Sequence, residues 1–99
     1  MTNPNPSLGT AIDDLFGVLI ERRREMPEGS YTAKLLADEN LALKKIGEEA
    51  TEVVMAGMAH DAAALRYEAA DLIYHLLVVM VREGVSPADV AAELESRRG

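Results

Sequence analysis

Apolar residues recur every three or four positions along most of the chain, the spacing that places them on one face of an α-helix. This pattern predicts four main helices at residues 11–25, 41–59, 62–82 and 87–96, and a short helical piece at 33–37. No stretch shows the strict alternation of apolar and polar residues that is typical of a strand. The chain is therefore expected to fold as an all-α, antiparallel helical bundle.

Polar residues stand where these helices should begin. Thr10, Asp61 and Ser86 are the expected N-caps of the first, third and fourth main helices, and Asp38 or Asn40 of the second. The fourth helix has the clearest signal, because a proline follows Ser86 and an aspartate stands three residues after it, as in a capping box. A glycine at position 84 should end the third helix.

The third main helix is more apolar than a helix with one buried face. Its apolar positions are Leu65, Ala69, Leu72, Ile73, Leu76, Leu77, Val79, Met80 and Val81. Residues expected to be buried elsewhere are Leu43, Ile46, Ala50, Val53, Val54 and Met58 on the second helix and Val90 and Leu94 on the fourth. A chain of 99 residues has a marginal core of its own. We therefore expect a homodimer with the third helix near its centre.

Composition narrows the class of protein. The net charge of −7 argues against a general nucleic-acid binder, which needs a basic face. The absence of cysteine excludes disulfides and thiolate metal sites. No apolar run is long enough to span a membrane, and no signal peptide is recognisable at the N-terminus, so a cytoplasmic protein is expected. We expect one domain over residues 1–99, with a flexible N-terminal arm at 1–7.

Two acidic clusters carry the candidate chemistry. Glu48, Glu49 and Glu52 lie three or four residues apart on the second helix, and Glu68 and Asp71 lie three apart on the third. If the two helices pack antiparallel, these carboxylates converge. Crowded carboxylates repel each other and tend to bind protons or hard cations, and oxygen ligands suit Mg²⁺. The sequence therefore predicts a magnesium site, and with it phosphate chemistry.

The alternative is that the acidic residues simply form a solvated helix face. Against this, both clusters stand among apolar residues, and no lysine or arginine follows Glu48, Glu49, Glu68 or Asp71 at the fourth position. A ferritin-like di-iron site is disfavoured, since neither histidine has a glutamate three residues before it. A buried, hydrogen-bonded structural role is favoured for His75 over a metal ligand or proton relay.

Several residues are candidates for substrate binding, each with an equally simple structural explanation. Arg22 begins a run of three arginines that also suits a helix C-terminus. Ser30 and Thr32 follow a glycine and could bind phosphate oxygens, or Thr32 could cap the short helical piece. Lys45 could bind phosphate or pair with Glu49 one turn later. The residues alone leave each choice open.

Longer strings resemble one family. They are Lys45–Val54 (KIGEEATEVV), Glu68–Leu77 (EAADLIYHLL) and Ser30–Leu36 (SYTAKLL). The first two resemble the ExxE and ExxD signatures of phosphoribosyl-ATP pyrophosphohydrolases, a MazG-like, all-α family of nucleotide pyrophosphohydrolases. The last resembles the family's SYT stretch. The resemblance covers residues 12–98.

The resemblance implies a dimeric enzyme that hydrolyses phosphoribosyl-ATP to phosphoribosyl-AMP and pyrophosphate with Mg²⁺, the second step of histidine biosynthesis. It implies metal ligation by Glu49, Glu52, Glu68 and Asp71, with Glu48 as a further ligand or base. It also implies phosphate or substrate contacts from Lys45, Ser30, Thr32, Lys34 and Arg22. A separate phosphoribosyl-AMP cyclohydrolase is an expected functional partner.

Two other functions stay open from the sequence. One is a house-cleaning (d)NTP pyrophosphohydrolase of the same superfamily, which would cleave simple triphosphates. The other is a non-enzymatic helical dimer or adaptor, whose acidic face would be solvated and would not bind Mg²⁺.

Overall fold

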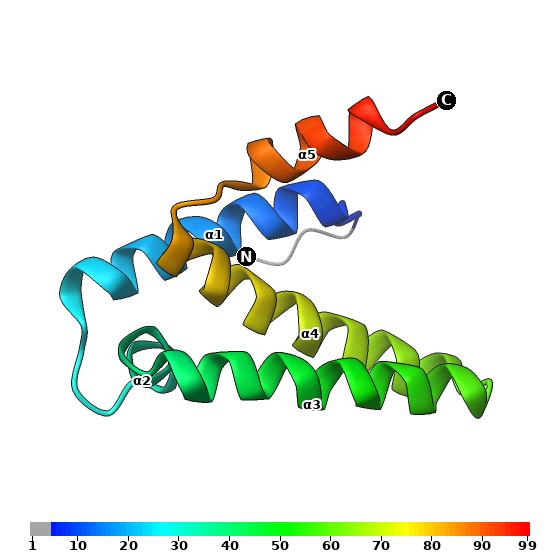
Figure 1. The fold of residues 1–99 in the computed structure, drawn as a ribbon, viewed down its shortest axis with the longest axis horizontal. Coiled ribbons are helices and arrows are strands. Elements are labelled where there is room, and N and C mark those ends of the chain that lie inside the picture. Colours follow the sequence, from blue (N-terminus) through cyan, green and yellow to red (C-terminus); the bar gives the residue numbers. More distant parts are fainter. Residues whose placement is uncertain (1–4) are drawn as a thin grey trace.

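The computed structural model describes residues 5–99, which form five α-helices and no strand (Figure 1). The helices are α1 (Leu8–Glu25), α2 (Tyr31–Ala37), α3 (Glu39–Met58), α4 (Ala62–Glu83) and α5 (Pro87–Ser96). The predicted all-α bundle is confirmed. The number of helices is five because the short piece before α3 is a regular α-helix of seven residues.

The predicted N-cap Thr10 is wrong, and Thr32, which the sequence left open as a cap, does not cap α2. Helix α1 is capped by Ser7, whose side chain accepts a hydrogen bond from the Thr10 amide, so the helix begins before Thr10. Likewise Ser30, not Thr32, caps α2 by accepting from the Ala33 amide. In both cases a serine upstream captures the free amides of the first turn. Ser7 thus belongs to α1 rather than to the predicted arm, of which residues 1–4 lie outside the described part of the chain.

The other predicted helix ends are confirmed. Asp38 caps α3 and Asp61 caps α4, each through a side-chain oxygen that accepts a backbone amide. Gly84 ends α4 in the left-handed region, with φ of 71°. Ser86 and Asp89 form a complete capping box at the start of α5, since each side chain bonds the other's backbone amide.

Helices α3 and α4 form a long antiparallel hairpin, with the most extensive contact between any two helices (Figure 1). The main core lies toward one end of this hairpin, where α1 and α2 pack against the C-terminal half of α4. Leu19, Leu35, Val78 and Val81 are its fully buried large side chains. The hairpin therefore extends beyond the core, and the acidic clusters lie along it.

The predicted apolar stripe of α3 is wrong in part. The residues buried on this helix are Ala42, Glu49 and Ala56, which repeat every seven positions and share one face. By contrast Leu43 and Val54 are about half exposed in this chain, at 49% and 58%. Small alanines allow α3 to approach α4 closely, so this face packs against the hairpin partner and the larger apolar side chains point elsewhere.

The prediction that α5 buries Val90 and Leu94 is also wrong for the isolated chain, because α5 has no buried residue. Leu94 is 60% exposed. Helix α5 lies beside α1, and its C-terminal end projects away from the hairpin (Figure 1). An apolar cavity of about 460 Å³ opens between α1, α4 and α5. Within residues 5–99, no helix has both the length and the apolar character needed to cross a membrane.

Two arginines tie the helix ends together. The Arg23 side chain, in the last turn of α1, donates a hydrogen bond to the Val81 carbonyl near the end of α4. The Arg82 side chain donates in the same way to the Leu36 carbonyl near the end of α2. Carbonyls in the last turn of a helix lack intrahelical donors, and cations there are also favoured by the helix dipole. These contacts hold α1 and α2 against the core end of α4.

Candidate active site

Four carboxyl groups meet between α3 and α4. Burial raises the pKa of Glu49 above its ordinary 4.5, and a hydrogen bond and negative charge from Asp71 and the charge of Glu68 raise it further, while His75 opposes. Partial desolvation, then the charges of Glu52 and Asp71 and a hydrogen bond to Glu52, raise the pKa of Glu68. The antiparallel packing thus produces the crowded carboxylates expected from the sequence.

The fifth acidic candidate, Glu48, lies differently. It is exposed on α3. Among residues 5–99 the structure gives it no hydrogen bond or ion pair with the other four carboxyl groups. Adjacent positions on a helix point about 100° apart, so Glu48 diverges from Glu49. Its role as ligand or base stays a prediction.

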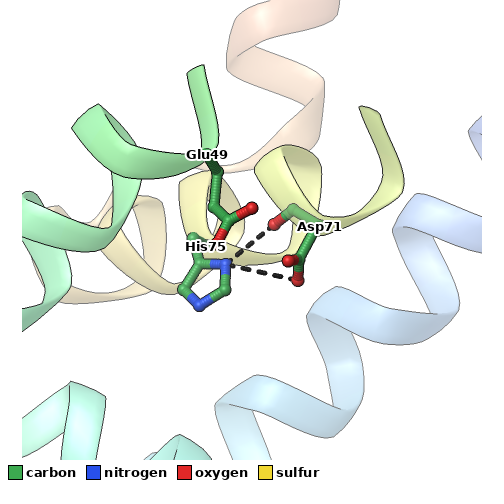
Figure 2. Close-up of side chains that lie close together, drawn as sticks. All are labelled: Glu49, Asp71 and His75. Carbon is green, nitrogen blue, oxygen red and sulfur yellow. Dashed lines mark hydrogen bonds and ion pairs between the residues drawn. The ribbon is translucent and has the colours of Figure 1, made fainter. Parts of the chain in front are cut away.

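His75 lies beside the buried end of the carboxyl cluster. Figure 2 shows its ring below the Glu49 side chain from α3, with dashed lines to two oxygens of Asp71 on α4. Its Nδ1 lies 2.8 Å from the Asp71 backbone oxygen and 3.7 Å from Asp71 Oδ1. The predicted buried, hydrogen-bonded histidine is confirmed, since His75 is only 3% exposed. Glu49, Asp71 and His75 each offer one potential metal-ligand atom within 4.8 Å of the others.

Aromatic residues from two helices continue the site toward α2. The Tyr31 hydroxyl lies 3.0 Å from His75 Nε2, and the Tyr31 ring stacks on Tyr74 with centroids 6.4 Å apart. The Tyr74 hydroxyl in turn bonds the Thr32 hydroxyl. Burial raises the pKa of Tyr31 above 10.0, with Lys45 opposing this shift. Tyr31, Thr32 and Lys45 therefore lie on the His75 side of the carboxyl cluster.

Two open cavities are lined by candidate site residues. One, of about 500 Å³, is lined by residues around α2 that include Ser30, Tyr31 and Lys34. The other, of about 320 Å³, is lined by residues of the hairpin that include Glu52 and Glu68. Ser30 already uses its side chain to cap α2. The α2 cavity is thus lined by two candidates for phosphate binding, Ser30 and Lys34, whereas the hairpin cavity is lined by two candidate metal ligands.

The remaining basic candidates differ in position. Lys45 is half-buried, and neither it nor Lys44 forms an ion pair within the described chain, so the simple pairing with Glu49 is not observed. Arg22 is half-buried in the last turn of α1, and in residues 5–99 its side chain has no hydrogen bond or ion pair. The structure therefore places Lys45 near the cluster through Tyr31 and provides no such link for Arg22.

The sequence reasoning assigned no role to Tyr31, although it stands between the candidates Ser30 and Thr32. The sequence did contain a signal for Tyr31. A large aromatic side chain stands there between two hydroxyl residues, directly after a glycine turn and at the start of a short helix, which is a polar setting for an aromatic residue. Its hydrogen bond to His75 spans 44 positions in the chain. Such a contact depends on tertiary packing, which spacing along the chain does not report.

The carboxyl-rich cluster, without sulfur ligands, has the chemistry of a site for a hard cation such as Mg²⁺. A family model for phosphoribosyl-ATP pyrophosphohydrolase matches residues 12–98 of the chain. The chain belongs to the phosphoribosyl-ATP pyrophosphohydrolase family. The match covers α2, α3, α4 and α5 completely, and with them every residue of the cluster.

Individual members of the phosphoribosyl-ATP pyrophosphohydrolase family agree with this assignment. The chain is 50% identical over 91 residues to a phosphoribosyl-ATP pyrophosphatase of Haloquadratum walsbyi, with 89% of this chain and 91% of that protein covered. It is 52% identical over 88 residues to the one of Pelotomaculum thermopropionicum, with 88% and 90% covered. It is also 44% identical over 97 residues to the histidine biosynthesis bifunctional protein HisIE of Deinococcus radiodurans, with 97% of this chain and 44% of that protein covered.

Proposed function

We propose that this chain hydrolyses phosphoribosyl-ATP to phosphoribosyl-AMP and pyrophosphate with Mg²⁺, as a step of histidine biosynthesis. One observation carries the proposal: the family match over residues 12–98 includes the four carboxyl groups that converge between α3 and α4. Without a cation, burial and neighbouring negative charge raise the pKa of Glu49 and of Glu68, so the site favours a ligand that brings positive charge.

Glu49, Glu52, Glu68 and Asp71 would hold the cation, and Glu48 would serve as a further ligand or as the base. Bound Mg²⁺ supplies charge neutralisation on phosphate oxygens and makes a bound water more acidic. The oxygen-only carboxyl set fits this ion better than it fits a softer metal. The packing of α3 on α4 brings the four carboxyl groups together before substrate arrives, which reduces the entropy lost when they bind the cation.

Basic and hydroxyl side chains around α2 would hold the phosphates. Lys45 is supported by its position beside Tyr31, and Lys34 and Ser30 by the α2 cavity that they line. A phosphate-binding role for Thr32 is supported by its hydrogen bond to Tyr74, which places its hydroxyl beside the aromatic residues of the site. Arg22 stays a prediction from the sequence alone. These groups would orient the polyanion and stabilise the charge that develops on the leaving pyrophosphate.

The decisive experiment measures pyrophosphate release from phosphoribosyl-ATP with and without Mg²⁺, next to a panel of NTPs and dNTPs. Mg²⁺-dependent release selective for phosphoribosyl-ATP is expected. Release from simple triphosphates only would favour the house-cleaning function, and no release from any substrate would favour the non-enzymatic adaptor.

Two variants connect the activity to the site. Asp71→Ala should abolish turnover, Glu52→Ala should lower it at least about tenfold, and both should leave the helical circular dichroism spectrum intact. Glu95→Ala is a matched control, because Glu95 is an exposed acid of α5 whose side chain, within residues 5–99, pairs with Arg98 alone. Full activity in either site variant would contradict the metal assignment.

The proposed active form is a homodimer. Support comes from the apolar surface left exposed on the hairpin, which includes Val54, Met58 and Leu65. Val54 and Met58 are four positions apart and so share a face of α3, and a large exposed apolar patch is unusual for a monomer. Analytical ultracentrifugation should find two chains per particle, and Leu65→Asp should shift the equilibrium toward one chain.

The proposed partner is a phosphoribosyl-AMP cyclohydrolase, which would use the product. The support is that the chain matches 44% of a protein described as bifunctional in histidine biosynthesis, which leaves room there for a second activity. A cytoplasmic location also stays a prediction from the sequence.

A further inference from the structure

Both ring nitrogens of His75 are occupied within the fold. Nδ1 lies 2.8 Å from the Asp71 backbone oxygen, and a carbonyl can only accept, so Nδ1 carries the proton. In the neutral ring, Nε2 is then an acceptor, and it lies 3.0 Å from the Tyr31 hydroxyl. The hydroxyl therefore donates to His75. A metal bound at either nitrogen would have to break one of these two hydrogen bonds.

The hydrogen bond to His75 holds Tyr31 between the α2 segment and the carboxyl cluster. The Tyr31 side chain is 47% exposed, yet its hydroxyl is held by His75 and its ring stacks on Tyr74. The same tyrosine lines the α2 cavity with Ser30 and Lys34. Its hydroxyl bonds His75, whose other ring nitrogen bonds the Asp71 backbone oxygen, so the hydroxyl lies one residue away from the carboxyl cluster. Tyr31 therefore stands between the candidate phosphate-binding segment and the cluster.

We propose that Tyr31 and His75 act as a pair of positioning residues, in which His75 joins α2 to the Asp71 turn of α4 and does not bind the metal. This rests on the proposed function. The pair sets the distance from the α2 segment to the carboxyl groups. His75 is 3% exposed and packs at right angles against both tyrosine rings, so the link is rigid. The cation is then held by carboxylates alone.

The first test is a double-mutant cycle on kcat with saturating Mg²⁺. Tyr31→Phe keeps the stacked ring and should lower kcat roughly three- to tenfold, the loss expected for one neutral hydrogen bond. His75→Asn keeps a donor near the Nδ1 position and loses the acceptor for Tyr31. Because the bond is already absent in His75→Asn, adding Tyr31→Phe should cause little further loss.

Two comparisons sharpen this cycle. Tyr74→Phe removes a neighbouring hydroxyl that bonds Thr32 instead of His75, so its effect should add to that of His75→Asn. His75→Gln places an acceptor near the Nε2 position, so Tyr31→Phe should retain its effect in that background, which also covers a failure of His75→Asn to fold. Additive losses for Tyr31→Phe and His75→Asn would overturn the proposal.

The second test needs neither substrate nor turnover. In ¹⁵N spectra of the metal-free protein at mildly alkaline pH, His75 should show a protonated Nδ1 and an unprotonated Nε2. The same pattern should persist when Mg²⁺ is added. A proton on Nε2 alone, or loss of the Nδ1 proton on adding Mg²⁺, would overturn the proposal. Loss of the proposed enzymatic function would instead appear as an inactive wild-type chain with the expected His75 spectrum.

Discussion

The carboxyl cluster has two halves that differ in their surroundings. The inner pair, Glu49 and Asp71, adjoins the buried His75 at the core end of the hairpin. The outer pair, Glu52 and Glu68, lies one turn further along and lines the open hairpin cavity. Glu49 is 8% exposed, whereas Glu52 is an exposed residue. Glu49 is thus held inside the fold and Glu52 faces solvent, whereas Asp71 and Glu68 are both half-buried.

This difference in burial indicates different roles for the inner and outer pairs in binding the cation. A buried carboxylate cannot be stabilised by water, so Glu49, the buried member of the inner pair, depends most on a cation for its charge. The outer pair can be hydrated when the cation is absent and can adjust its side chains when substrate arrives. The inner pair should therefore determine whether the cation binds, and the outer pair should adjust the coordination of the bound cation when substrate arrives.

The largest expected effect separates the two pairs by activity. Asp71→Asn should lower kcat/KM by about 10³ or more, because a fixed group that stabilises developing charge contributes roughly 10²–10³ and the inner pair also holds the cation. Glu68→Gln should lower it by about 10 to 10², since a neighbouring hydrated carboxylate can compensate. The measurement is Mg²⁺-dependent pyrophosphate release from phosphoribosyl-ATP. If Glu68→Gln proved the more damaging variant, the assignment of inner and outer roles would be reversed.

The next effect is on stability and does not need the substrate. Mg²⁺ should stabilise the wild-type protein by about 2.7 kcal/mol at one hundred times its Kd, as for any ligand of the native state. Glu49→Gln should abolish most of this gain and raise the Tm of the metal-free protein by several degrees, since about 1 kcal/mol shifts the Tm of such a domain by roughly 4–8 °C. Thermal melts with and without Mg²⁺ measure both. An unchanged Mg²⁺ shift in Glu49→Gln would show that the inner pair does not bind the cation.

A smaller effect appears in the pH dependence of stability. The native pKa values of Glu49 and Glu68 are raised above 4.5, so the native state binds more protons than the unfolded chain between 4.5 and the raised values. Their contribution is fully present below 4.5 and is lost as pH rises through that window. Mg²⁺ competes with the same protons, so its stabilisation should grow with pH.

Comparison with a variant isolates this contribution from the other titrating groups. The difference in Tm between Glu49→Gln and the metal-free wild type should increase as pH rises above 4.5 and should vanish below it. Glu95→Gln is the matched control, because Glu95 is exposed on α5 and far from the hairpin cluster in the chain. A difference that shrank with rising pH would contradict the raised pKa of Glu49.

Local signals in the sequence predicted most of the fold. Asp38, Asp61, Gly84 and Ser86 act through neighbours within a few residues, so their roles as helix ends could be read from spacing. The convergence of Glu49 with Asp71 could also be anticipated, because it needs only two helices and a short turn. The error at Thr10 arose because a serine three residues upstream competed for the same amides, and the choice that stayed open at Thr32 was decided in the same way by Ser30.

Contacts between distant segments could not be predicted in the same way. The bond from Tyr31 to His75 joins α2 to α4, and the choice of Ala42 and Ala56 for the buried face of α3 depends on how closely α4 approaches. Hydrophobicity alone favoured the larger side chains, such as Leu43 and Val54, for that face. The structure buries alanines on that face instead. How closely two helices approach depends on the tertiary packing, which the pattern of apolar residues along the chain does not report.

The smallest expected effect tests whether the phosphates of the substrate bind on the side of the cluster where Glu49, Asp71 and Tyr31 lie. Lys45 is half-buried near Tyr31, whereas its neighbour Lys44 is exposed. Lys45→Gln should raise KM for phosphoribosyl-ATP roughly fivefold, since a partly exposed charge contributes about 1 kcal/mol, and Lys44→Gln should change it less than about twofold. Raising the ionic strength should reduce the Lys45 effect, because salt screens exposed charges. Equal effects of the two lysines would mean that the substrate approaches across the open face of α3 instead of from the side of Tyr31 and the inner pair.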